Sequence, residues 1–209
     1  MAEMSKNNLE VKILSLFGAL PLLIWAAGSL PQRGVLKESL SVLTLVAFSL
    51  MVGLFYLSRI NPATQRTKTG SLIKLHKIIG YTALPVLILH PLLLVVPRFY
   101  EAGVAPLDAF ITIVTTFSSQ GILFGLGGYG LLFLLGATAL LRKKLPLSYP
   151  DWRLIHGLLA LIALLSTLLH VVDLGRHFNL TTAGLVALLA AGGVYLLLKN
   201  WSQIQGRKR

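Results

Sequence analysis

The sequence has no cysteine, which excludes disulfide bonds, thiolate metal sites and cysteine-ligated iron–sulfur clusters. Charged residues are also scarce, at 12% of the chain against about 25% in an average soluble domain. Only seven residues are acidic, whereas 19 are lysine or arginine. The chain therefore lacks the polar surface that a soluble domain of this length needs.

Long apolar runs take the place of the missing charges. Hydrophobic residues make up 55% of the 209 residues, and the mean hydropathy is +0.77. A helix that crosses a membrane needs about 20 apolar residues. Six runs approach that length: Val11–Leu30, Ser39–Leu57, Leu72–Val96, Ile111–Leu141, Leu154–Val172 and Thr181–Leu198. None alternates in polarity as barrel strands do, so the sequence predicts an all-α membrane protein with a six-transmembrane-helix bundle.

The fourth run is longer than one span needs, and its first part, through Gln120, is expected outside the membrane or at its surface. We treat residues 1–209 as a single transmembrane domain. The link Arg59–Ser71 has the composition of a loop, and Asp151 is a candidate N-cap for the fifth helix. Four glycines fall inside the fourth run, where they favour close helix packing: Gly125, Gly127, Gly128 and Gly130.

The net charge of +12 is distributed unevenly along the chain. If the N-terminus is cytoplasmic, fifteen lysines and arginines fall on the inner side and four on the outer side. This positive-inside bias predicts that both termini are cytoplasmic, in a bacterial inner (plasma) membrane. The basic rim is expected to contact anionic lipid headgroups, and nucleic acid is not an expected partner.

Two pairs of histidines recur with one spacing. His76 and His90 lie fourteen residues apart in the third run, and His156 and His170 lie fourteen apart in the fifth. On a helix this spacing is just under four turns, so both members of a pair face the same way, about 21 Å apart. The two helices run in the same direction through the membrane. His76 can therefore oppose His156 near the cytoplasm, and His90 can oppose His170 nearer the outer side.

Two imidazoles at one level are too few for a bare zinc or copper ion, which takes three or four protein ligands. They suit haem, whose porphyrin supplies the equatorial ligands. The pattern therefore predicts two haems stacked across the bilayer, with all four histidines as axial ligands. Covalent attachment through C-x-x-C-H is excluded because there is no cysteine.

Three further residues are candidates for binding haem propionates. Arg153 precedes His156 by three residues and is the candidate for the inner haem, although positive-inside placement explains it equally well. His177 follows His170 by seven residues and points the same way if the helix continues. With Arg176 it is a candidate for outer propionates or an incoming acceptor, and an exposed loop is the favoured alternative.

Over about residues 40–194 the chain resembles the ferric reductase-like transmembrane domain, a family that includes NADPH oxidases, ferric reductases and the haem-binding membrane subunit of a sulfoxide reductase. The resemblance rests on "LHKIIGY…LHPLLL" in the third run and "WRLIHGLLA…LLH" in the fifth. It implies two b-type haems on the four histidines and single-electron transfer from the cytoplasm to an outside acceptor. The sequence carries no flavin or NADPH domain of the oxidase type, so we expect a separate flavoprotein or quinol as donor.

The sequence thus predicts a transmembrane electron conduit that acts as a haem-dependent oxidoreductase component. Ferric chelate, oxygen, quinone and a periplasmic protein all remain open as acceptors. Two other functions also remain open. One is a proton or ion pathway with the histidines as relay groups, although the interior between the pairs is nearly all aliphatic. The other is a haem-containing membrane anchor for a separate redox partner.

Overall fold

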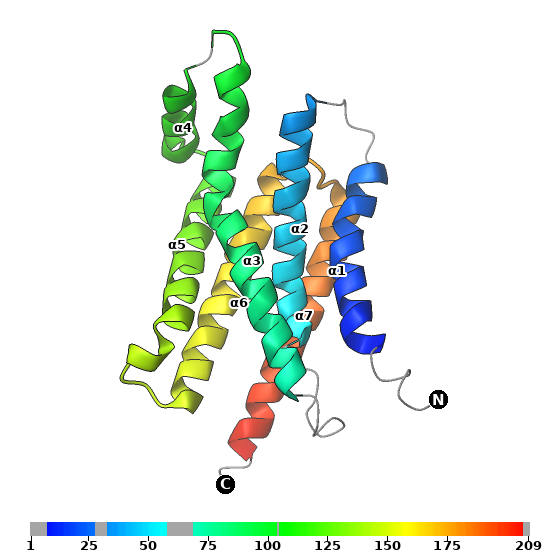
Figure 1. Cartoon of the computed structure of the whole chain (residues 1–209), viewed down its shortest axis with the longest axis vertical. Coiled ribbons are helices and arrows are strands. Elements are labelled where there is room, and N and C mark those ends of the chain that lie inside the picture. Colours follow the sequence, from blue (N-terminus) through cyan, green and yellow to red (C-terminus); the bar gives the residue numbers. More distant parts are fainter. Residues whose placement is uncertain (1–7, 28–32, 58–68, 104, 207–209) are drawn as a thin grey trace. The chain divides into compact units, whose positions relative to one another are not determined.

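The computed structural model describes residues 8–27, 33–57, 69–103 and 105–206, and these are helical almost throughout (Figure 1). Seven α-helices occur in these ranges: α1 (Asn8–Ala27), α2 (Val35–Leu57), α3 (Thr69–Val95), α4 (Pro106–Thr115), α5 (Gln120–Leu140), α6 (Tyr149–Leu174) and α7 (Leu180–Gly206). Two short 3-10 helices, η2 (Val96–Tyr100) and η3 (Arg142–Lys144), follow α3 and α5. Most of the expected loop at Arg59–Ser71 lies outside the described residues.

Among the residues that the structure describes, five helical segments are long and apolar enough to cross a membrane: Val35–Leu57, Leu72–Tyr100, Gln120–Leu140, Tyr149–Leu174 and Leu180–Ser202. They correspond to five of the six expected runs. The remaining run forms α1, whose described apolar part, Val11–Ala26, is shorter. By the length and composition of its helices, the chain is an integral multi-pass membrane protein.

The long fourth run is divided by a break at residues 116–119, where α4 ends and α5 begins. The side-chain oxygen of Ser119 caps α5 by accepting a hydrogen bond from the backbone N–H of Ile122 at 3.3 Å. The expected N-cap at Asp151 is wrong by three residues. Ser148 caps α6, and its side chain accepts from the N–H of Asp151, because Asp151 already lies in the first turn.

The helices group into two compact units, each with its own core. The first contains α1, residues 41–57 of α2, α3 up to Val86 and α7 from Leu185. Its centre is the ring of Phe17, which is 1% exposed and packs over Gly53 and 5.2 Å from the ring of Tyr56. The Tyr56 hydroxyl donates to the carbonyl of Leu189 at 2.7 Å, which satisfies it within an apolar interior.

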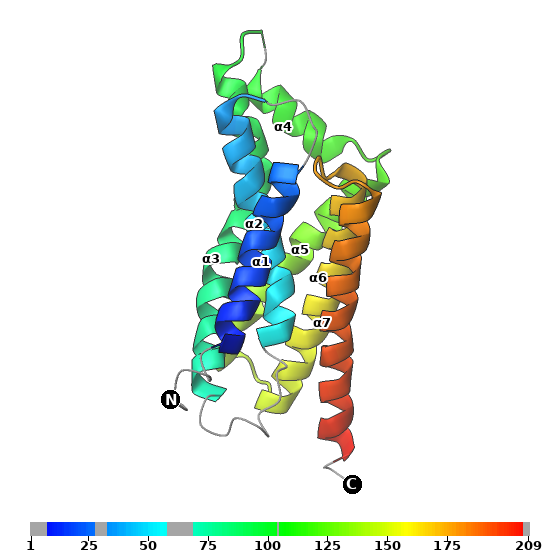
Figure 2. The ribbon, with the colours of Figure 1, turned by 90° about the vertical axis from the view of Figure 1, so that its right-hand side faces the viewer.

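The second unit contains residues 32–40, the end of α3 from Leu87, and everything from η2 to Gly184. Within it, α5 and α6 lie side by side and antiparallel (Figures 1 and 2). Gly121 of α5 approaches Leu174, and Gly128 approaches Thr167, so sequence numbers rise along one helix as they fall along the other. The absence of side chains on this face of α5 lets the two backbones come close, as expected for the glycines of this run.

Candidate functional site

His90 and His170 lie close together in the second unit. His90 is in the last turns of α3, and His170 is in the last turns of α6. Their ring centroids are 6.4 Å apart, and the ring planes are inclined at 74°. The outer pair that the fourteen-residue spacing predicted is therefore brought together by the fold.

The ring of His170 is fixed against α5. Its Nδ1 lies 2.8 Å from the carbonyl oxygen of Gly121, and because a carbonyl can only accept, Nδ1 carries the proton. The same ring lies over Gly125, where an added Cβ would be only 2.5 Å from Nδ1. The hydrogen bond leaves the Nε2 lone pair available for a metal, and this arrangement is typical of metal-ligating histidines.

The two ring centroids are 6.4 Å apart, so one imidazole from α3 and one from α6 lie at the same level, where together they would hold one haem iron. In addition, the buried Nδ1 of His90 has no hydrogen-bond partner among the described residues, so this imidazole retains polar capacity for a ligand.

The site offers too few protein ligands for a bare metal ion. Over the ranges that the structure describes, no three side chains of histidine, cysteine, aspartate or glutamate gather in a metal-binding group. Two histidines alone leave most coordination positions of a free ion unfilled. The donor set fits a metal whose other ligands come from a macrocycle.

The inner pair is divided between the two units. His76 lies near the start of α3 in the first unit, and His156 lies in the second turn of α6 in the second unit. His156 stacks on Trp152, with ring centroids 4.9 Å apart and planes inclined at 25°. Trp152 precedes it by four residues, so the two side chains share one face of α6.

The rings at the start of α6 are held by contacts from the end of α5 and from η3. The Nε1–H of Trp152 donates to the carbonyl oxygen of Thr138 at 3.0 Å. The guanidinium of Arg142 lies over the rings of Tyr149 and Trp152, at 4.4 and 5.0 Å from their centroids. Arg153, the candidate for an inner propionate, has its guanidinium 5.7 Å from the centroid of Tyr149.

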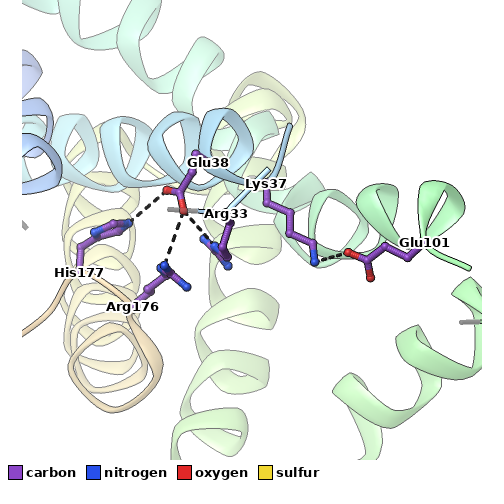
Figure 3. A network of polar contacts seen from close by, with 6 residues as sticks. All are labelled: Arg33, Lys37, Glu38, Glu101, Arg176 and His177. Carbon is purple, nitrogen blue, oxygen red and sulfur yellow. Dashed lines mark hydrogen bonds and ion pairs between the residues drawn. The ribbon is translucent and has the colours of Figure 1, made fainter. Parts of the chain in front are cut away.

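A polar network occupies the other end of the second unit (Figure 3). Glu38 is its centre: one carboxylate oxygen accepts from Arg33 at 3.0 Å and lies 3.8 Å from Arg176. The other oxygen lies 3.7 Å from Nε2 of His177. Next to it, Lys37 pairs with Glu101, which also accepts from Arg98 at 2.7 Å.

The helix does not continue to His177, as would be needed for it to point the same way as His170. α6 ends at Leu174 with Gly175 as its C-cap. His177 therefore lies in the link to α7, and its side chain is directed at Glu38 instead (Figure 3). Arg176 and His177 already have a carboxylate of the chain as neighbour.

Burial and charge shift two pKa values in this network. Burial lowers the pKa of His177, and Arg176 and Arg33 add to that effect, while Glu38 opposes it. Hydrogen bonds from Lys37 and Arg98 lower the pKa of Glu101. At neutral pH, His177 is therefore uncharged and Glu101 is ionised.

Sequence reasoning missed several residues of these sites. Trp152 was detectable, because it stands four residues before a candidate ligand on the same helix. Gly121 was detectable in the same way, as the first member of a stripe that continues with Gly125 and Gly128. Glu38 gave no signal, because its partners at 176 and 177 are distant in sequence.

Comparison with known proteins identifies the family of this chain. The chain belongs to the family described as ferric reductase like transmembrane component, whose model matches residues 43–167. This stretch includes His76, His90 and His156 and ends shortly before His170. Membership implies transmembrane electron transfer, and members of the family typically bind haem.

An uncharacterized protein of Archaeoglobus fulgidus is 38% identical over 160 residues, which is 76% of this chain and 87% of the relative. No solved structure matches the chain.

Proposed function

We propose that this chain carries single electrons across the membrane through two stacked b-type haems, from a donor on the cytoplasmic side to an acceptor outside. His90 and His170 would bind the outer haem, and His76 and His156 the inner one. The observation that carries the proposal is the outer pair, with its 6.4 Å ring separation and the Nδ1 hydrogen bond that leaves Nε2 of His170 available.

Bound haem supplies a metal that gains and loses one electron without bond making in the protein. The residues of the chain orient the ligand, leave space for its ring and surround the haem. The Gly121 carbonyl fixes the tautomer and orientation of His170. The glycine at 125 leaves space for the ring. The aliphatic residues of the surrounding helices would keep water away from the haem, which favours electron transfer over side reactions.

The three candidates for binding haem propionates have different roles in this proposal. Arg153 would pair an inner propionate, because it precedes His156 by less than one turn on α6. For Arg176 and His177 we favour a place near the approach of the outside acceptor over propionate binding, since Glu38 already lies beside both. The electrons would come from a separate flavoprotein or quinol.

The first test is a reduced-minus-oxidised spectrum of the purified protein, with haem quantified per chain. We expect two low-spin haems in the wild type and one in the His90→Ala/His170→Ala variant. His177→Ala is the matched control, because it removes the fifth histidine and should keep two haems. Well-folded protein without haem would overturn the proposal and favour a proton relay through the histidines.

The second test distinguishes a conduit from an anchor. Protein in sealed vesicles is given an impermeant reductant outside and ferricyanide inside. A conduit reduces the internal ferricyanide, and the rate falls to that of protein-free vesicles in the His90→Ala/His170→Ala variant. If haem is bound but ferricyanide is not reduced in either orientation, the chain is an anchor and the conduit is wrong.

A further inference from the structure

The first turns of α6 carry a continuous stack of aromatic rings that ends at His156. The proposed function gives no role to its other two members, Tyr149 and Trp152. Tyr149 and Trp152 have ring centroids 6.1 Å apart and planes within 14° of parallel. Trp152 and His156 follow at 4.9 Å and 25°. These separations are those of aromatic rings in contact. Tyr149 is 48% exposed and the other two are partly buried, so the stack leads from the surface to a candidate haem ligand.

The stack is rigidly held. Trp152 has its indole N–H bonded to the carbonyl of Thr138 on α5, and its ring lies under the guanidinium of Arg142. The same guanidinium covers Tyr149. A cation within about 6 Å of a ring centroid attracts it, so one arginine holds both rings from the side of η3.

The surroundings of the stack are strongly basic. Three consecutive cations, Arg142, Lys143 and Lys144, form η3, and all three are exposed. Between residues 138 and 156 the only acidic residue is Asp151. Its carboxylate accepts a hydrogen bond from the hydroxyl of Ser148, so it serves the cap of α6. The exposed face beside the stack therefore has a positive potential.

We propose that this aromatic–cationic cluster, formed by Arg142, Lys143, Lys144, Tyr149 and Trp152, is where an acidic electron-donor protein docks and passes its electron to the haem that His156 would hold. The inference rests on the proposed function and adds the position and charge of the donor. A reduced flavin on the donor would supply one electron, and the haem that His156 would hold would accept it. No covalent bond forms or breaks, and the chain gives up no proton.

A lipid headgroup site would account for the cations but not for the ordered rings. Phosphate groups need only the three exposed cations of η3. A route for electrons needs packed atoms between the surface and the iron, because electron transfer weakens steeply across gaps. Trp152 supplies such atoms and is fixed by a hydrogen bond, so the observations favour a donor protein.

The docking part is tested with haem-loaded protein in phosphatidylcholine nanodiscs, using a flavodoxin with fully reduced flavin as the acidic donor. Stopped-flow absorbance follows haem reduction. We expect Lys143→Glu/Lys144→Glu to lower the second-order rate constant at least about tenfold at low ionic strength, and the difference to vanish in high salt. Lys199→Glu is the control, because Lys199 is also an exposed cation beside a tyrosine, 5.9 Å from the ring of Tyr195.

The route is tested at Trp152. Trp152→Leu should slow reduction once the donor is bound, without changing donor affinity, whereas Trp152→Phe should restore most of the rate because it keeps a ring. Electron paramagnetic resonance of the oxidised protein gives a readout independent of turnover. Loss of the stack on His156 should shift the signal of one haem in Trp152→Leu only. Trp201→Phe controls for loss of a tryptophan elsewhere.

The outcomes separate the two proposals. Haem content is measured first, and its absence from the wild type would overturn the proposed function itself. With both haems present, unchanged donor kinetics in the charge variant would overturn the docking site. Weakened binding to anionic vesicles in that same variant would then identify a lipid site. An unchanged rate and resonance signal in Trp152→Leu would overturn the route.

Discussion

The imidazole of His170 rests on a part of α5 where the chain has no side chain. Gly125 lies directly below the ring, and the carbonyl that accepts its proton belongs to Gly121, one turn earlier. Ring position and ring tautomer are thus both set by α5, although the candidate ligand is on α6. A change on α5 should therefore affect haem binding without touching a histidine.

Gly125→Ala tests this dependence. The added Cβ would lie 2.5 Å from Nδ1 and 2.8 Å from Cε1 of His170, so the ring must move and its bond to Gly121 must lengthen. We expect haem per chain to fall from two toward one, measured in purified protein. Gly130→Ala is the matched control on the same helix, because nothing lies within 4 Å of its Cβ position.

In the control, the substitution removes a flexible glycine from a helix interior, which stabilises a helix by up to about 1 kcal/mol. Gly130→Ala should therefore keep both haems and unfold no earlier than the wild type. Equal haem content in both variants would show that His170 does not depend on the space at Gly125.

At the scale of the element, helix ends matter most for the site. α5 begins one residue before Gly121, so the carbonyl that holds His170 lies in the first turn, where helices fray. Ser119 stabilises this turn by accepting from Ile122. The break after α4 therefore places a capped helix start opposite the end of α6.

Ser119→Ala tests the cap. It should lower the free energy of unfolding by about 1 kcal/mol and speed amide hydrogen exchange in the first turn of α5. The neighbouring Ser118→Ala is the control, because the side chain of Ser118 is exposed and lies outside the helix. Equal exchange rates in the two variants would mean that the cap hydrogen bond does not hold this turn.

At the scale of the whole molecule, orientation in the membrane decides which part of the chain a cytoplasmic donor can reach. The uneven distribution of lysine and arginine predicts that η3 faces the cytoplasm and that the link after η2 faces outside. The proposed donor site at η3 requires this orientation. It can be measured cleanly, because the natural chain has no cysteine that would react with a probe.

Single cysteines at Lys143 and Ala102 test the orientation, since both residues are exposed. In intact cells or right-side-out vesicles, an impermeant maleimide should label Ala102→Cys and leave Lys143→Cys unlabelled until the membrane is opened. The reverse pattern would place η3 outside and would contradict both the predicted topology and the donor site.

The sequence by itself determined that the chain is a membrane protein. It also predicted the five described segments that can cross a bilayer and the pairing of the two outer histidines. Hydropathy and helical periodicity are local properties, so apolar runs and a fourteen-residue spacing can be recognised from the sequence alone. The sequence predicted the ends of the helices less accurately. Ser148 rather than Asp151 caps α6, because a cap depends on which backbone N–H a side chain reaches.

Only the tertiary structure decided which residues surround the histidines. Gly121 reaches His170, and Glu38 reaches His177, across long stretches of sequence. Thr138 likewise holds Trp152 from a neighbouring helix. Such contacts depend on how α5 and α6 pack and on where the chain leaves α6 at Gly175. Composition and spacing fix the pattern along a helix, whereas the partner across from it is set by packing between helices.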